Sequence, residues 1–151
     1  MDLSDLDDLY RDAILDHCRR PRNHDPLEDP DISGQAVNPF CGDEVALQLV
    51  LDDGRVSRVG VQGAGCSINQ ASASMLSEIA AGRSIEEIDV LSALFKSMMG
   101  GYSPSEEELA RLGELRSLSG VLRFPVRIKC ALLAWSALDE ALEDHSKEHK
   151  G

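Results

Sequence analysis

The change of hydrophobic period along the chain constrains the fold more than any other feature of the sequence. Between residues 33 and 62, apolar and polar side chains alternate as a half-buried β-strand requires, although the alternation is imperfect over 55–62. Residues 44–51 and 55–62 are separated by Asp-Asp-Gly, which is typical of a hairpin turn. With the shorter run at 33–38, the pattern predicts a small antiparallel sheet of about three strands.

Segments before and after this region follow the helical period. Apolar stripes spaced by three and four residues predict helices over residues 4–18, 67–82, 84–99 (as one helix or two short ones), 103–118 and 124–144. Ser84 and Glu87 form a capping box, and Ser103 is the expected cap of the next helix, with Pro104 at its first position. In the last helix the expected buried stripe is Ala131, Ala134, Trp135, Leu138 and Leu142.

The order of these elements predicts the fold class. One helix, a small sheet and then several helices indicate an α+β fold in which an antiparallel sheet packs against helices. The 151 residues are the size of one ordinary domain, and the sequence contains neither an internal repeat nor a linker. We therefore expect a single domain over residues 1–151, with residues 145–151 as a frayed tail.

The charge balance bears on partners and on the compartment. With 27 acidic against 15 basic residues the formal net charge is −12, which disfavours nucleic acid and anionic membranes as main partners. The acidic N-terminus lacks the apolar region of a signal peptide, and the apolar runs are too short to span a bilayer. We expect a cytoplasmic protein, where four cysteines favour metal binding or thiol chemistry over disulfides.

Cys41 and Asp43 lie two positions apart in the stretch Asn-Pro-Phe-Cys-Gly-Asp-Glu-Val. On an extended backbone, side chains two positions apart point the same way, and Gly42 between them allows a close approach. One metal ion can therefore take a sulfur and an oxygen from this step. Taken alone, a buried thiol followed by a turn aspartate is the better interpretation of the stretch.

Cys66 and Cys130 each stand near the start of a predicted helix. Cys66 follows a glycine-rich turn, where the helix dipole lowers the pKa of a thiol; a small residue tolerated in a tight turn is the alternative. Cys130 is flanked by Arg127 and Lys129, which also favour the thiolate, although taken alone a core position on an apolar helix is the better interpretation. Cys18 follows Ile14 by four residues, so packing is the better interpretation for this thiol.

Considered together, three cysteines and one aspartate at element junctions predict a four-ligand site. Such a set suits tetrahedral zinc or an iron–sulfur unit, and junctions are where functional sites are usually built. The spacings of 25 residues from Cys41 to Cys66 and 64 from Cys66 to Cys130 match no zinc-finger or Cys-x-x-Cys motif. Spacing alone therefore leaves the kind of site open.

Four collinear stretches resemble one known family. The segments LYRDAILDHCRRPRN, NPFCGDEV, GAGCSINQASASMLSE and FPVRIKCALLAW are similar to the SufU and IscU proteins of iron–sulfur cluster biogenesis, whose domain is NifU N-terminal-like. The long segment between Cys66 and Cys130 resembles the extra region of the SufU branch. Lys129 stands where IscU-type scaffolds carry a histidine, and Cys18 stands where relatives often carry an aromatic residue.

The resemblance implies a function and roles for residues. It implies zinc bound by Cys41, Asp43, Cys66 and Cys130, and a cysteine desulfurase (SufS-like) as partner. Cys41 matches the acceptor of persulfide sulfur, and Arg127 matches a supporting arginine of this sulfurtransferase-like accessory protein. Sulfur would then pass to downstream Suf scaffold proteins. The alternatives are a scaffold that assembles a transient iron–sulfur cluster and a zinc-stabilised interaction domain without chemistry of its own.

Overall fold

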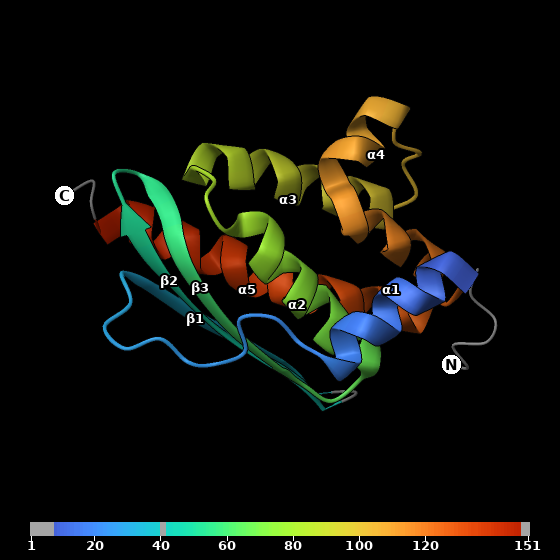
Figure 1. Cartoon of the computed structure of the whole chain (residues 1–151), viewed down its shortest axis with the longest axis horizontal. Helices are drawn as coiled ribbons and strands as arrows, with labels where there is room; N and C mark the ends of the chain where they lie inside the picture. Colours follow the sequence, from blue (N-terminus) through green and yellow to red (C-terminus); the bar gives the residue numbers. More distant parts are fainter. Residues whose placement is uncertain (1–7, 40–41, 149–151) are drawn as a thin grey trace.

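Three antiparallel strands form the sheet that the sequence predicts. The computed structural model describes residues 8–39 and 42–148, the side chains of 8–10 and 148 excepted. Strands β1 (Ile32–Asn38), β2 (Asp43–Asp52) and β3 (Arg55–Ala64) pair in the order β1-β2-β3 (Figure 1). The register places Asn38 opposite Asp43 and Glu44 opposite Ala64, so the end of β1, the start of β2 and the end of β3 meet at one end of the sheet.

A β-bulge explains the imperfect alternation in β3. The register between β2 and β3 shifts between Val50 and Leu51, which pair with Arg58 and Val56. Ser57 is therefore the extra residue, and its hydroxyl donates to the carbonyl of Val50 at 3.1 Å. Because the bulge inverts the alternation once, three valines at uneven spacing all face the core: Val56, Val59 and Val61.

Two helices pack on one face of the sheet, and other helices pack on those two. The elements are α1 (Asp8–Arg19), α2 (Ser67–Ala80), α3 (Ile85–Met99), α4 (Glu106–Leu112), the 3₁₀ segment η2 (Gly113–Arg123) and α5 (Pro125–Glu148). Helices α2 and α5 pack on the sheet and on one another, α1 packs on α2, and α3 packs on α5 (Figure 1). The α+β class is confirmed. Among the described helices, none combines the length and apolarity needed to cross a membrane.

The core lies between the sheet and these helices. One face of β2 is buried through Val45, Leu47 and Leu49. The predicted stripe of α5 is buried in full, and the Trp135 ring packs on that of Phe95 with centroids 5.2 Å apart. The alternating and helical patterns therefore identified the core-facing residues of both elements correctly.

Helices α4 and α5 differ from the sequence-based expectation. The helix expected to run to residue 118 ends at Leu112, where the 3₁₀ segment η2 begins. Ser105, and not Ser103, caps α4, because its hydroxyl accepts from the Glu108 N–H while the Glu108 carboxylate accepts from the Ser105 N–H. This reciprocal capping box starts the helix at Glu106, so Pro104 precedes it. Helix α5 continues to Glu148, into the segment where we expected a tail; residues 149–151 lie outside the described part.

Candidate metal centre

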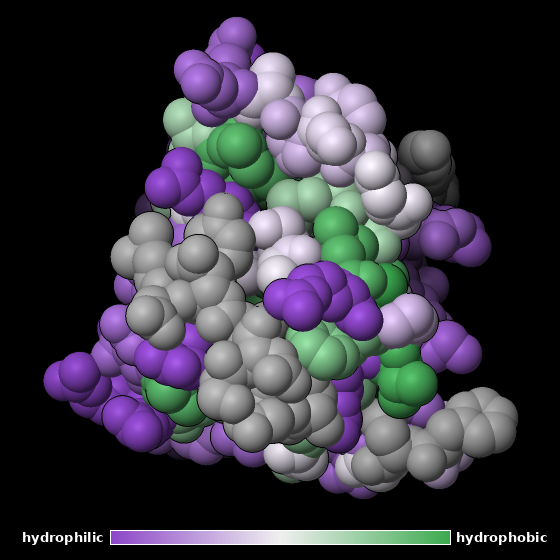
Figure 2. All heavy atoms as spheres, turned by 90° about the vertical axis from the view of Figure 1, so that its right-hand side faces the viewer, coloured by the Kyte–Doolittle hydropathy of each residue, from purple (hydrophilic) through white to green (hydrophobic). Residues whose placement is uncertain are grey.

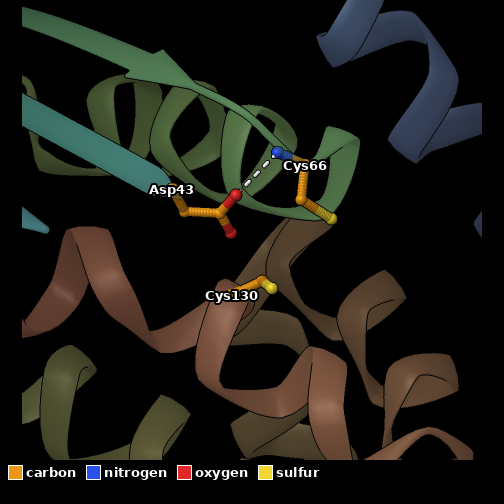
Figure 3. A group of neighbouring side chains, drawn as sticks. All are labelled: Asp43, Cys66 and Cys130. Carbon is orange, nitrogen blue, oxygen red and sulfur yellow. Dashed lines mark hydrogen bonds between the residues drawn. The ribbon is translucent and has the colours of Figure 1, made fainter. Parts of the chain in front are cut away.

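The register of the sheet brings Asp43 next to Cys66. Asp43 opens β2, and Cys66 follows the end of β3 by two residues. One carboxylate oxygen of Asp43, Oδ1, accepts a hydrogen bond from the Cys66 backbone N–H at 2.8 Å (Figure 3). The side chain is 1% exposed, and its other oxygen, Oδ2, is buried without a hydrogen-bond partner among the described residues. A buried carboxylate oxygen in this state suits a cation.

Cys66 is the N-cap of α2, as the sequence predicts. Its sulfur accepts from the Ile68 N–H at 3.4 Å, so the thiol lies at the positive end of the helix. Asn69 fixes this helix start, because its side-chain amide donates to the carbonyls of Glu44 at 3.1 Å and Ala64 at 2.9 Å. Sequence reasoning missed Asn69; an amide side chain in the first turn of a helix rich in alanine and serine was the available indication.

Cys130 lies in the second turn of α5 and is fully buried. The hydroxyl of Ser72 donates to the carbonyl of Ala131 at 2.6 Å, which ties α2 to α5 beside this thiol. The sulfurs of Cys66 and Cys130 and a carboxylate oxygen of Asp43 lie within 4.8 Å of one another (Figure 3). The structure therefore brings together three of the four predicted ligands, whereas Cys41 lies outside the described residues.

Arg127 also lies at this centre. Its Nη1 donates to the Cys66 sulfur at 3.2 Å from one turn before Cys130 on α5. The negative charge of Cys66 and then hydrogen bonding to Cys130 raise the pKa of the Arg127 guanidinium. Lys129 is exposed and lines a neighbouring groove instead. Of the two basic residues that flank Cys130, only Arg127 contacts the sulfur of Cys66.

The electrostatics of the centre fit a divalent cation. Burial raises the pKa of the Cys130 thiol, and the Asp43 carboxylate beside it raises this pKa further. Among the described residues, Arg127 is the positive charge beside this buried carboxylate and the two sulfurs. A thiophilic divalent ion would add positive charge and displace the thiol protons. Oδ2 of Asp43, which has no hydrogen-bond partner among the described residues, would coordinate it. The donors present therefore fit zinc.

Gly65 makes the close approach of Asp43 to Cys66 achievable. Its φ is +102°, and an added Cβ would lie 2.3 Å from Oδ1 of Asp43. Gly82 also has a positive φ, +85°, but an added Cβ there would meet no atom within 4 Å. The two glycines are therefore a matched pair that separates backbone strain from the clash with Asp43.

We expect Gly65→Ala to lose zinc affinity and Gly82→Ala to keep it. Both variants should lose about 1–2 kcal/mol of unfolding free energy because alanine disfavours a left-handed backbone. Only Gly65→Ala should also displace the Asp43 carboxylate. Urea unfolding and competition for zinc against a coloured chelator would measure the two effects. Equal zinc affinity in the two variants would contradict this account of Gly65.

Cys18 packs beside the centre. Its thiol donates to the Ser67 carbonyl at 2.9 Å, and the half-buried side chain packs against the core, in agreement with the packing role expected from the sequence. Burial, with the charge of Cys66 as the second cause, raises the pKa of this thiol from its ordinary 9.0 to about 11. Cys18 is therefore protonated at neutral pH.

The raised pKa of Cys18 predicts an alkaline loss of stability in the metal-free protein. The unfolded chain ionises this thiol near pH 9.0, whereas the folded chain holds the proton until about pH 11. The stabilisation is therefore complete below pH 9.0 and disappears as the pH rises through about 11. Urea midpoints at about pH 8 and pH 10.5 should fall less in Cys18→Ala than in the unchanged protein. An equal fall in both would contradict the prediction.

The fold and this centre define a class of protein. It is an α+β protein with one sheet, in which the start of β2 supplies a carboxylate and the starts of α2 and α5 supply two thiols to one site. The family model of the NifU-like N terminal domain matches residues 9–150. The chain belongs to this family, as the resemblance in the four sequence stretches implied.

Two curated relatives span almost the whole chain. The "Zinc-dependent sulfurtransferase SufU" of Bacillus subtilis (strain 168) is 40% identical over 148 residues, which cover 98% of this chain and 97% of the relative. The "Iron-sulfur cluster assembly scaffold protein IscU" of Streptococcus pyogenes serotype M1 is 40% identical over 144 residues, covering 95% and 88%. Equal identity to proteins with these two names leaves both activities to be considered for this chain.

Solved structures share the fold. A crystal structure from Fervidobacterium islandicum AW-1, named as an iron–sulfur cluster assembly scaffold protein for the SUF system (FiSufU), matches with a TM-score of 0.80 and 30% identity, covering 86% of this chain and 93% of that one. The N-terminal part of a NifU-like protein from Brucella abortus has a TM-score of 0.81 at 21% identity, covering 97% and 99%, and shows the same fold.

Proposed function

We propose that this protein is a zinc-dependent sulfur acceptor of iron–sulfur cluster biogenesis. It would take persulfide sulfur from a cysteine desulfurase and pass it on to downstream Suf scaffold proteins. The observation that carries the proposal is the convergence of two sulfurs with a buried carboxylate whose Oδ2 has no hydrogen-bond partner among the described residues. Kinship at 40% identity with a protein named a zinc-dependent sulfurtransferase supports the same activity.

The proposed zinc ligands are Asp43, Cys66, Cys130 and Cys41. The first three are already gathered, and Cys41 precedes Asp43 by two residues in the chain. When bound, zinc holds thiols in the thiolate form without oxidising or reducing them, which suits sulfur transfer. The Asp43 carboxylate is the harder donor among softer sulfurs, so we expect it to be the weaker ligand.

The transfer step that we propose takes place on Cys41. Its thiolate attacks the terminal sulfur of the desulfurase persulfide, forming a new S–S bond on Cys41 while the desulfurase cysteine leaves as a thiolate. No external oxidant or reductant is required, because the sulfane sulfur moves from one thiolate to the other. Arg127 supports the step by keeping positive charge beside Cys66, so that the sulfurs of the centre stay available as thiolates.

A groove beside the centre suits a protein partner. It has a volume of about 330 Å³ and lies between the end of β1 and α5, lined by Val37, Asn38, Pro39, Lys129, Leu132, Leu133 and Ser136. Val37 in this groove is 57% exposed, and Val126, one turn before Lys129 on α5, is 74% exposed. Figure 2 shows the end of the molecule where α1 begins, with patches of hydrophobic side chains among hydrophilic ones. We propose that the desulfurase docks over this mixed surface.

Persulfide mapping tests the proposed function. The zinc-loaded protein would be incubated with a cysteine desulfurase and cysteine, digested without reductant and examined by mass spectrometry. We expect one added sulfur atom on the peptide that contains Cys41 and none on the peptide that contains Cys18. An unmodified Cys41 beside a desulfurase that is turning over would overturn the proposal.

A cluster scaffold is the second candidate function. Two thiols and a carboxylate can also hold iron, and one relative of 40% identity is named an iron–sulfur cluster assembly scaffold. Lys129 beside Cys130 favours the sulfur acceptor, because an ammonium group is not a metal ligand at neutral pH. Anaerobic reconstitution with iron and sulfide, followed by visible absorption and transfer to an acceptor apoprotein, would distinguish the two functions.

A further inference from the structure

A second group of metal-ligating side chains lies apart from the thiol centre. His17 comes from α1, Glu78 from α2 and Glu114 from η2. One ring nitrogen of His17 and one carboxylate oxygen from each glutamate lie within 4.8 Å of one another. His17 is fully buried, whereas the side chains of Glu78 and Glu114 are 45% and 56% exposed. A fixed imidazole therefore faces two carboxylates whose partly exposed side chains can change their rotamers.

The His17 ring is held by the nitrogen that points away from the glutamates. Its Nδ1 lies 2.7 Å from the hydroxyl oxygen of Ser74, and the Arg22 N–H donates to the same oxygen at 2.9 Å. Metal-binding histidines are anchored in this way, with the second ring nitrogen bonded to a neighbouring polar group. The anchor aims Nε2 at both glutamates, 3.0 Å from Glu114 Oε2 and 3.5 Å from Glu78 Oε1.

Two carboxylates face the single ring nitrogen Nε2 of His17. Nε2 carries at most one N–H, so it cannot bond well to two carboxylates at once. Arg22 lies 3.8 Å from Glu78 through Nε, but its guanidinium is engaged at 2.5 Å by Asp16. A cavity of about 500 Å³ adjoins His17, Glu78 and Glu114, and it leaves room for an ion together with water ligands. Arg83 also lines this cavity, but its guanidinium is engaged by the Ile79 carbonyl at 2.7 Å and by Glu87 at 3.7 Å.

We propose that His17, Glu78 and Glu114 form a second divalent-metal site. One imidazole nitrogen and two carboxylate oxygens suit Mn²⁺, Fe²⁺ or Zn²⁺, whereas Ca²⁺ and Mg²⁺ prefer oxygen ligands alone. The site contains no sulfur, so its ion preference differs from that of the thiol centre. A bound ion would tie η2 to α1 and α2, three elements that are distant in sequence.

Binding of Mn²⁺ to the zinc-treated protein tests this site. One equivalent of Zn²⁺ is added first so that the thiols are occupied, and Mn²⁺ does not displace zinc from thiolates. The loss of the electron paramagnetic resonance signal of free Mn²⁺ should give about one bound ion per chain. In a spectrum of the histidine rings, bound Mn²⁺ should broaden the signals of His17 and spare those of the exposed His24.

Two double variants distinguish Mn²⁺ binding at this site from nonspecific attraction of Mn²⁺ to an acidic protein surface. Glu78→Gln/Glu114→Gln removes two charges at the site, and Glu106→Gln/Glu107→Gln removes two exposed charges on α4. We expect Mn²⁺ affinity to fall at least about tenfold in the first variant and to stay essentially unchanged in the second. Equal weakening in both, broadening of His24 alone, or no bound Mn²⁺ would overturn the proposal. Because neither readout uses sulfur transfer, failure of the proposed function would leave the result interpretable.

Discussion

Zinc binding is expected to collapse when Asp43 is replaced by alanine. The side chain supplies the one carboxylate of the centre, and its Oδ2 has no hydrogen-bond partner among the described residues. Loss of a residue that merely supports a ligand typically lowers metal affinity by about 10–100-fold, so removal of a ligand should cost at least about 100-fold. Zinc retained after dialysis against a chelator, measured by elemental analysis, would give the affinity.

Asp43→Asn is the matched control for this loss. Its amide oxygen can still accept the hydrogen bond from the Cys66 N–H, whereas alanine leaves that N–H without its partner. Asp43→Ala should therefore lose about 1–3 kcal/mol of unfolding free energy in the metal-free state, and Asp43→Asn much less. Both variants should bind zinc poorly. Full zinc affinity in Asp43→Asn would show that the negative charge of Asp43 is not required at the centre.

Cys41→Ala is expected to abolish stimulation of the desulfurase. Alanine offers no thiolate to attack the persulfide, so turnover should fall to the rate of the desulfurase alone. The three gathered donors remain, so zinc affinity should also fall, but zinc supplied in excess should still occupy most of the chains. Steady-state sulfide or alanine production with and without the variant would measure the effect, with elemental analysis of the same sample.

The appropriate comparison for Cys41→Ala is Cys18→Ala. Cys18 is a second thiol of the chain, but it packs against the core and donates to the Ser67 carbonyl. Cys18→Ala should therefore stimulate the desulfurase as the unchanged protein does. Normal stimulation by Cys41→Ala would disprove the acceptor role, whereas loss of stimulation in both variants would point to disturbed docking.

Local patterns were sufficient to predict most of the elements. Alternation identified the inward face of β2, and the glycine-rich turn before Cys66 indicated the start of α2. The cap of α4 was misplaced by two residues because Ser103 and Ser105 are both good caps in sequence. Only the reciprocal bonds between Ser105 and Glu108 in the folded chain decide between them.

Sequence patterns did not predict the contacts between elements that are distant in the chain. The pairing of Asp43 with Cys66 depends on the register of β2 and β3, and its geometry could not be read from spacing. The resemblance to a known family supplied that ligand set instead. His17 shows the same limit, because Glu114, its partner at 3.0 Å, lies 97 residues away in the chain.

The dispersed origin of the proposed zinc ligands has a consequence for biosynthesis. Asp43 and Cys66 are 23 residues apart, and Cys130 comes from the last helix of the chain. Bringing residues so far apart in sequence together costs loop-closure entropy before their contacts can stabilise the centre. A short peptide of the chain therefore cannot form the centre. On the ribosome, a nascent chain without α5 would lack one of the sulfurs. Metal loading therefore follows the emergence of α5 from the ribosome and its docking against α2.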